Sequence, residues 1–151
     1  MEHILGTLKN ADTMIKRYPF LNKTGMIFGT IFHDIGEVLD YRFDSKANDY
    51  ITTNHRRLIG HCGGAIEILK PYFSKYNISM DLQEYLFQII GSHMGNEMAS
   101  ISEMCTPETI CLNFADHMDA LADSMQRAKD KYLQGKTNKI TVANSCLYFY
   151  E

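Results

Sequence analysis

The sequence predicts an all-α protein of five or more helices with a short extended tail. Three observations lead to this prediction. Apolar residues recur at helical spacing along most of the chain, Pro and Gly residues end the segments, and only residues 139–150 look extended. The length of 151 residues fits a single domain, expected over residues 1–151, that can bury a full core.

The first two helices are expected in the N-terminal quarter of the chain. Residues 3–18 carry apolar residues at helical spacing, and Pro19 ends this helix. Asn22 or Thr24 is a suitable cap for a second helix, because both side chains accept hydrogen bonds from free backbone N–H groups. This second helix is expected to run to about Tyr41.

The middle of the chain is expected to form a loop and a third helix. Residues 42–53 are polar and are predicted to be a loop. The third helix is expected over residues 54–69, with Pro71 as its end. Poor helix formers within it indicate a close approach of backbone or ligand. These residues are Gly60, Gly63 and Gly64.

Two more helices and the tail complete the prediction. Asp81 is the expected cap of a helix over residues 82–92. Thr106-Pro107-Glu108 is a strong helix start, with a cap, a pre-set first residue and an acid in the first turn. This helix is expected over residues 107–133 and to end at Gly135. The extended residues 139–150 are expected to pack back on the bundle.

The composition narrows the classes of function. The net charge of −3 and the pI of about 6.0 argue against an extended basic platform for long nucleic acids. There is no apolar run of about 18 residues and no secretory signal, so a cytoplasmic protein without a membrane span is expected. The cysteines lack metal-knuckle spacing and are predicted to be reduced thiols. They are Cys62, Cys105, Cys111 and Cys146.

A His-Asp pair points to a metal centre. His33 and Asp34 follow an apolar run and precede Gly36, where two ionisable side chains need a partner or a metal. Further candidate ligands are spread along the chain, and one shared centre would satisfy all of them. They are His3, His61, His93 and Asp116. Imidazole and carboxylate ligands suit one or two divalent ions of manganese, iron, zinc, cobalt or nickel.

Such a centre suits hydrolysis at phosphorus. One carboxylate can bridge two ions, and Asp34 is the natural choice. Two ions about 3.5–4 Å apart would stabilise both the attacking and the leaving oxygen, and a water on a Lewis acid can become a nucleophile near neutral pH. No triad of a nucleophilic serine or cysteine is evident in the sequence.

The same residues carry a family resemblance. His33-Asp34-Ile35-Gly36 resembles the name-giving doublet of the HD phosphohydrolase superfamily, whose ligand order is H…HD…H…H…D. Nearly the whole chain is similar to the C-terminal HD domain of the YhaM-type 3′–5′ exoribonucleases. The further segments that carry this likeness are Met1-Glu2-His3-Ile4-Leu5, Leu58-Ile59-Gly60-His61, Ser92-His93-Met94-Gly95, Thr106-Pro107-Glu108, Ala115-Asp116-His117-Met118-Asp119-Ala120 and Tyr148-Phe149-Tyr150.

The resemblance implies an HD-domain helical bundle and a division of the ligands between two metals. The first metal would be held by His3, His33, Asp34 and Asp116, and the second by Asp34, His61 and His93. Asp34 would bridge, and a hydroxide between the metals would attack phosphorus. Asp119 is expected to support a ligand rather than to bind metal itself.

Three departures from the family bear on the substrate. Glu37 stands where many relatives have a lysine that could help to bind phosphate, and Met94 replaces a second histidine. The N-terminal nucleic-acid-binding domain of the exoribonucleases is expected to be missing, because the first ligand is His3. A compact nucleotide or the end of a short oligonucleotide is therefore the favoured substrate.

The sequence thus predicts a metal-dependent phosphohydrolase of nucleotides or short oligonucleotides. Arg56 and Arg57 are candidates for neutralising substrate phosphate, and His117 or a metal-bound water is the candidate general acid. Two alternatives stay open, namely 3′–5′ exoribonuclease activity and a non-catalytic, metal-containing nucleotide-binding or scaffold protein. Base and sugar preference, metal identity and a possible homo-oligomer are also open.

Overall fold

The structure, a computed structural model, describes residues 2–95, 100–134, 140–143 and 145–147, and it is mainly helical. This confirms the predicted all-α class. The described residues form seven helices and two short hairpins. The elements are α1 (Glu2–Arg17), α2 (Lys23–Phe32), α3 (Glu37–Asp40), β1 (Tyr41–Asp44), β2 (Asp49–Thr52), α4 (Asn54–Leu58), α5 (Gly60–Lys75), α6 (Met80–Ser92), α7 (Pro107–Leu133), β3 (Ile140–Val142) and β4 (Ser145–Leu147).

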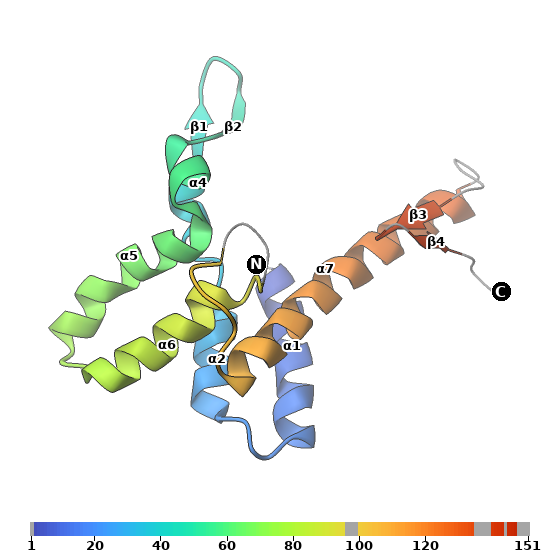
Figure 1. The fold of residues 1–151 in the computed structure, drawn as a ribbon. Coiled ribbons are helices and arrows are strands. Elements are labelled where there is room, and N and C mark those ends of the chain that lie inside the picture. The colour runs from blue at the N-terminus through green and yellow to red at the C-terminus, as the bar shows by residue number, and fades with distance from the viewer. Residues whose placement is uncertain (1, 96–99, 135–139, 144, 148–151) are drawn as a thin grey trace.

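The helix α2 lies at the centre of the bundle, with α1 and α7 on one side and the α5–α6 pair on the other (Figure 1). The first apolar cluster joins α1, α2 and α7, and its buried members are Ala11, Leu21, Met26 and Ala115. The second joins α5 and α6 and receives Phe28 and Phe32 of α2; its buried members are Ala65, Leu69, Phe73, Leu86 and Ile90. Both clusters therefore hold α2 in place, and the ends of the helices around it meet at one pole.

Helix starts were predicted well where a side chain caps the backbone. The Asn22 side chain accepts a hydrogen bond from the backbone N–H of Gly25 at 2.9 Å, and Thr106 accepts one from Thr109 at 3.2 Å. The bounds of α7 agree with the predicted 107–133. The start of α6 differs, because Ser79 occupies the N-cap position and Asp81 lies in the first turn, where its charge favours the helix N-terminus.

The predicted second helix was too long. It ends at Phe32, and a turn over residues 33–36 separates it from the four-residue helix α3. The cause is the close contact of Gly36 with the backbone of α5, where an added Cβ would overlap the carbonyl oxygen of His61. Gly64 lies on the other side of this contact, which agrees with the close approach expected of the glycines in this helix.

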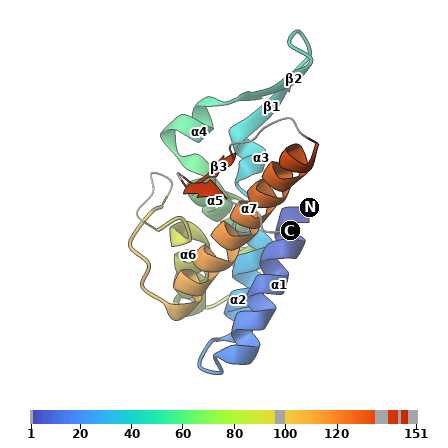
Figure 2. The same cartoon turned by 90° about the vertical axis from the view of Figure 1, so that its right-hand side faces the viewer.

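The predicted loop over residues 42–53 was wrong. The chain forms an antiparallel hairpin of β1 and β2, with Phe43 opposite Tyr50 and Tyr41 opposite Thr52 (Figure 2). Aromatic cross-strand pairs stabilise a hairpin, and Asn48 takes the left-handed conformation (φ 50°) at the turn between the strands. The polar composition of this segment hid its alternation of aromatic and charged residues.

The predicted third helix is interrupted and is longer than expected. A break at Ile59 and Gly60 separates α4 from α5, and Gly60 has a φ of 75°, which suits glycine. Pro71 does not end α5 but lies inside it. Leu69 and Phe73 on either side of the proline are buried in the second cluster, and this packing offsets the lost backbone hydrogen bond.

The C-terminal part of the chain contains the hairpin of β3 and β4, and β3 packs against α7. The predicted extended conformation is confirmed for residues 140–142 and 145–147. Gly135, residue 139 and Tyr148-Phe149-Tyr150 lie outside the described residues. Within the described ranges, no helix is long and apolar enough to cross a membrane.

Candidate metal centre

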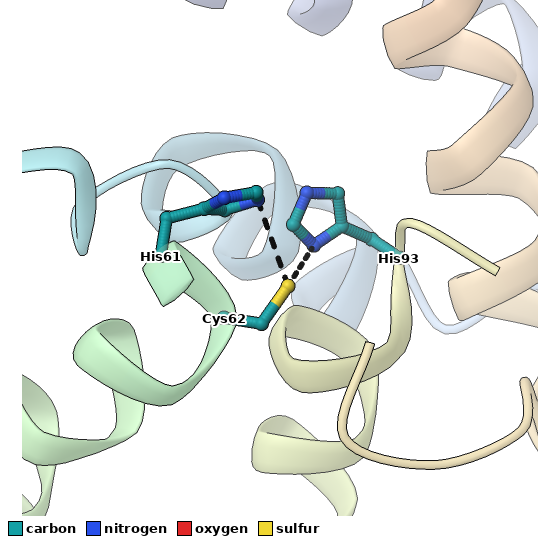
Figure 3. A group of neighbouring side chains, drawn as sticks. All are labelled: His61, Cys62 and His93. Atoms are coloured by element: carbon teal, nitrogen blue, oxygen red, sulfur yellow. Dashed lines mark hydrogen bonds between the residues drawn. The ribbon is translucent and has the colours of Figure 1, made fainter. Parts of the chain in front are cut away.

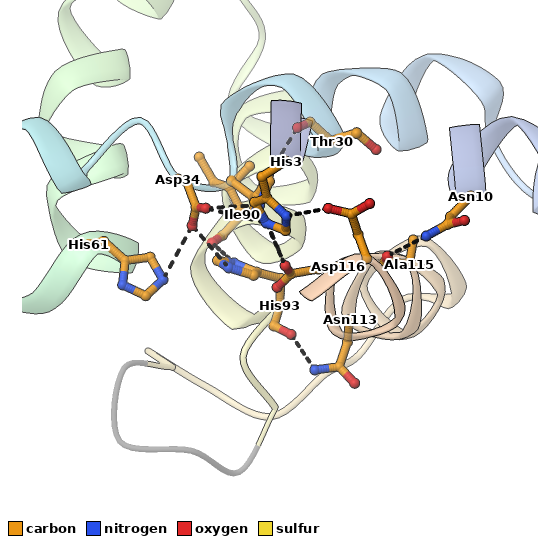
Figure 4. A network of polar contacts seen from close by, with 12 residues as sticks. His3, Asn10, Thr30, Asp34, His61, Ile90, His93, Asn113, Ala115 and Asp116 are labelled. Atoms are coloured by element: carbon orange, nitrogen blue, oxygen red, sulfur yellow. Dashed lines mark hydrogen bonds and ion pairs between the residues drawn. The ribbon is translucent and has the colours of Figure 1, made fainter. Parts of the chain in front are cut away.

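The six predicted ligands meet at one pole of the bundle, and all of them except His33 are labelled in Figure 4. Each comes from a different position in the fold, and all lie near a helix end or on a helix that passes the pole. His3 lies in the first turn of α1, His33 caps the C-terminus of α2, and Asp34 lies in the turn that follows. His61 lies in the first turn of α5, His93 caps the C-terminus of α6, and Asp116 is in α7. We call this group the Asp34 cluster.

Asp34 is the centre of the cluster because its two carboxylate oxygens face different histidines. Oδ2 lies 3.2 Å from Nε2 of His33 and 3.8 Å from Nε2 of His3. Oδ1 lies 3.8 Å from Nε2 of His61 and 3.9 Å from Nε2 of His93. One carboxylate is therefore placed between two groups of donor atoms, as a bridging ligand is.

Asp116 completes the group on the Oδ2 side of Asp34. Its Oδ1 lies 2.9 Å from Nε2 of His3 and 3.9 Å from Nε2 of His33. The ligand atoms of His3, His33 and Asp116 all lie within 4.8 Å of one another. This grouping is the one that the family resemblance implied for the first metal, and the Oδ1 side holds the two histidines implied for the second.

Backbone carbonyls fix which nitrogen of two buried imidazoles points into the cluster. Nδ1 of His33 lies 2.9 Å from the carbonyl oxygen of Thr30, and Nδ1 of His93 lies 2.8 Å from that of Ile90. Because a carbonyl oxygen only accepts, both Nδ1 atoms carry a proton, so in the neutral form of each imidazole the lone pair is on Nε2, which points toward Asp34. This is the orientation in which histidine binds metal.

The two inward Nε2 atoms test whether the site fits a cation. Among the described residues, neither Nε2 of His33 nor that of His93 has a hydrogen-bond partner, although both residues are fully buried. An unsatisfied buried nitrogen is costly, and a lone pair that faces a carboxylate oxygen is repelled by it. A cation between these atoms removes both problems, so the donor set fits a divalent metal.

Asp119 supports the cluster from outside. Its Oδ2 accepts a hydrogen bond from Nδ1 of His3 at 2.7 Å, which turns Nε2 of His3 toward Asp116. An added Cβ at Gly6, on the facing side of α1, would overlap the Asp119 carboxylate. The supporting role expected of Asp119 agrees with this geometry.

The charges crowded around Asp34 shift the pKa values of three members of the cluster. Burial and the nearby His33 lower the pKa of His93 to about 3, so this imidazole is neutral at pH 7. Burial alone would raise the pKa of Asp34, but contact with His33 and the charges of the surrounding histidines hold it at about 2. Burial would lower the pKa of His33, yet Asp34 and Asp116 raise it above its ordinary value. The cluster thus attracts positive charge.

Cys62 is a neighbour of the cluster that the sequence did not single out (Figure 3). Its Sγ lies 3.6 Å from Nε2 of His61 and 3.8 Å from Nδ1 of His93. Burial and the charge of Asp34 raise the pKa of this thiol to about 12. The neutral thiol and the engagement of His93 Nδ1 with Ile90 agree with a reduced, packed cysteine.

The three candidate substrate-binding and acid residues lie apart from the ligands. The Arg56 guanidinium is 3.9 Å from Oδ2 of the buried Asp40 and lies over the Tyr41 ring at 4.9 Å. Arg57 is exposed on the same short helix, α4. His117 follows Asp116 on α7 and is turned by about 100° around the helix axis. In the described part of the chain, it makes no hydrogen bond or ion pair with the cluster.

Glu37 lies between the cluster and α4. Burial and the charge of Asp34 raise its pKa, whereas His61 and Arg56 act in the opposite direction. The acidic side chain therefore stands on the side of the cluster from which α3 and the β1–β2 hairpin leave, at the position where many relatives were expected to carry a lysine.

Comparison with known proteins identifies the family. The model of the family described as "HD domain" matches residues 1–121, which include all six residues of the Asp34 cluster. The chain belongs to the HD domain family. The match covers α1 to α6 and the first half of α7, the part of the fold that builds the pole.

Curated relatives are named 3′-5′ exoribonuclease YhaM. The protein from Shouchella clausii (strain KSM-K16) is 28% identical over 154 residues, which cover 99% of this chain and 46% of the relative. Those from Geobacillus sp. (strain WCH70) and Bacillus subtilis (strain 168) are each 25% identical over 150 residues, covering 45% and 47% of their own lengths. This chain thus spans about half the length of these relatives. No solved structure matches it.

Proposed function

We propose that the Asp34 cluster holds two divalent metal ions and hydrolyses phosphoester bonds of nucleotides or short oligonucleotides. The observation that carries this proposal is the position of Asp34, whose two oxygens face two separate groups of imidazole nitrogens. The match of the HD domain family to the residues that build the cluster supports the same reading.

The ligand roles follow from the contacts. His3, His33 and Asp116 would hold the first ion on the Oδ2 side of Asp34, and His61 and His93 would hold the second on the Oδ1 side. Divalent cations bound there would act as Lewis acids that polarise the phosphoryl group and activate water. Asp34 would fix the distance between the two ions. The carbonyls of Thr30 and Ile90 would orient the imidazoles of His33 and His93 toward the ions.

The remaining candidate residues have supporting roles in the proposal. Arg56 and Arg57 would attract substrate phosphate from α4, because guanidinium groups pair well with phosphate. His117 would donate a proton to the leaving oxygen after a side-chain rotation, or a bound water would do so. We further propose that residues 1–151 form one HD domain, since the β3–β4 hairpin packs on α7.

A second candidate function is 3′–5′ exoribonuclease activity, which the name of the YhaM relatives favours. Because the chain spans about half of those proteins, the activity of the whole relative is not carried over. The two functions differ in the product, since an exoribonuclease shortens RNA by successive nucleotides from the 3′ end, whereas a nucleotidase releases phosphate.

The experiment that tests the proposal combines elemental analysis with a hydrolysis screen. The purified protein would be assayed with added manganese, iron, zinc, cobalt or nickel on nucleoside mono-, di- and triphosphates, cyclic dinucleotides and short RNA. The proposal expects bound divalent metal and metal-dependent release of phosphate or nucleotides. Metal that raises the melting temperature without any hydrolysis would contradict it and would favour a non-catalytic binding protein.

A further inference from the structure

The β1–β2 hairpin carries an exposed aromatic face. Tyr41 and Phe43 are two residues apart on β1 and so lie on one face of the strand, and Phe43 pairs with Tyr50 across the hairpin. The rings of Phe43 and Tyr50 contact edge to face at 5.5 Å between centroids. Their exposed fractions are 36% for Tyr41, 54% for Phe43 and 69% for Tyr50. We call these three side chains the aromatic face.

This face does not serve the core of the described fold. The hairpin projects beyond α4, away from both apolar clusters, as two views of the chain show (Figures 1 and 2). Exposed apolar surface usually marks an interaction site when several such side chains gather. Flat aromatic rings that remain accessible are suited to stacking with the bases of single-stranded nucleic acid.

Positive charge accompanies the aromatic face, although the whole chain carries −3. The segment from Tyr41 to Arg57 has four basic residues against two acidic ones, and the carboxylate of Asp40, just before it, lies 3.9 Å from Arg56. The basic residues are Arg42, Lys46, Arg56 and Arg57, and the acidic residues are Asp44 and Asp49. The guanidinium of Arg56 lies 4.9 Å from the Tyr41 ring centre, so a cation and an aromatic ring are already stacked at the base of the hairpin. This pairing of rings and cations complements bases joined by phosphates.

The base of the hairpin is tied to the segments that bear the cluster. Buried Asp40 accepts a hydrogen bond from Nδ1 of His55 at 2.9 Å, and Thr53 donates from its backbone to the Asp40 carbonyl at 2.9 Å. The ring of His55 lies against Gly64 of α5, the helix that carries His61 in its first turn. The hairpin is therefore inserted between Asp34 and His61 in the sequence, and its base is linked through Asp40 and His55 to α5, the helix that carries His61.

These observations assign a substrate class to the proposed centre. We propose that the aromatic face and Arg56 bind the bases and phosphates of a single-stranded oligonucleotide whose reacting phosphodiester lies at the Asp34 cluster. The inference rests on the proposed phosphohydrolase function, and it favours a single strand over a mononucleotide. A short hairpin offers room for few bases, which agrees with the lack of an extended basic platform.

A binding assay without catalysis tests the inference separately from the proposed function. The full chain in EDTA would be titrated into fluorescently labelled single-stranded RNA and DNA of two to ten nucleotides, and anisotropy would give Kd. The variant F43A/Y50A is expected to weaken binding of the longer strands about tenfold or more, because base stacking on each ring contributes strongly. Comparing Kd for RNA with Kd for DNA of the same length shows whether the 2′-hydroxyl contributes to binding.

The matched control is F20A/Y72A, which removes two aromatic rings of similar exposure, 69% and 55%, from other parts of the surface. It is expected to leave Kd unchanged. The conservative variant F43Y should retain binding, and F43L should not, because leucine keeps the apolar surface but lacks a flat ring. Melting temperatures of all variants show whether the fold is intact.

A hydrolysis arm separates the two claims. With metal, F43A/Y50A should keep the wild-type rate on a chromogenic phosphodiester and lose kcat/KM on oligonucleotides. Wild-type protein that binds no single strand, or equal binding by F43A/Y50A, would overturn the inference even if hydrolysis is observed. Light scattering that shows a dimer in the wild type and a monomer in F43A/Y50A, with unchanged binding of nucleic acid, would assign the face to a second copy and also overturn it. Absence of hydrolysis with ring-dependent binding would overturn the proposed function and the reacting phosphodiester at the cluster, but would support the binding of a single strand by the aromatic face.

Discussion

The Asp34 cluster and the β1–β2 hairpin are joined in sequence but built on opposite principles. The cluster buries polar side chains, and backbone carbonyls of Thr30 and Ile90 fix two of its imidazoles. The hairpin exposes aromatic side chains that contact one another and Arg56 rather than the core. A buried polar group is costly to a fold and suits a catalytic or cation-binding role. An exposed cluster of aromatic rings suits the binding of a ligand or partner.

This difference separates chemistry from substrate choice. Changes within the cluster should affect every substrate, because all hydrolysis would pass through the same ions. Changes on the hairpin should affect only substrates long enough to reach it. Variants in the two regions can therefore break this separation or measure it more finely.

The largest effect is expected for Asp34→Ala. Loss of the central carboxylate removes the contact between both groups of histidines, and the Lewis-acid contribution of several kcal/mol corresponds to about a thousandfold in rate. Turnover of a chromogenic diester and of oligonucleotides should fall alike, and elemental analysis should show the metal lost. Circular dichroism should show helix content close to that of the wild type. Full activity would refute the site.

His61→Ala should have the next largest effect. His61 faces Oδ1 of Asp34 only, so the variant is expected to lose the second ion and keep the first. Titration with manganese, followed by elemental analysis after desalting, measures the number of ions bound per chain. Loss of both ions together would show that the two positions form a single coupled site.

Asp119→Ala should have an intermediate effect. The carboxylate orients His3 without facing the cluster, and loss of such a supporting hydrogen bond typically lowers metal affinity about 10–100-fold. The control is Asp123→Ala, one turn further along α7, where the carboxylate pairs with Arg127 at the surface. Chelator competition gives the affinity of each variant. Equal affinities in the two variants would argue against a role of His3 as a ligand.

Arg57→Ala should have the smallest effect. The side chain is exposed on α4, so its charge should speed the capture of phosphate-bearing strands by only a few-fold and in a salt-dependent manner. kcat/KM on an oligonucleotide should fall at low salt and match the wild type at high salt, whereas the chromogenic diester should show no change. A large loss on the diester would instead place Arg57 at the reacting phosphate.

The sequence predicted the helical class better than the path of the chain between the candidate ligands. Asn22 and Thr106 cap their helices as expected, since capping depends on residues within one turn. The break after Phe32 depends on the contact of Gly36 with α5, a helix 25 residues away in sequence, and local patterns do not report it. Pro71 lies inside α5 for a similar reason, because packing around Leu69 and Phe73 overrides the local preference.

Two features near the site were missed for different reasons. Tyr41, Phe43 and Tyr50 alternate with charged residues on either side of a polar turn, which is a hairpin pattern. Cys62 follows His61 directly in the sequence. Its thiol faces His93 because α5 begins anew after the break at Ile59, and this local geometry sets the direction of the side chain. The first feature was accessible to a count of alternation, whereas the second required the three-dimensional path.

The central claim is that Asp34 lies between two bound cations. A crystal structure of the protein grown with manganese, with anomalous data collected at the manganese edge, tests it most directly. The account predicts two anomalous peaks about 3.5–4 Å apart, one beside each oxygen of Asp34. Absence of any peak at the cluster, or a single peak bound by His61 and Cys62 without Asp34, would contradict it.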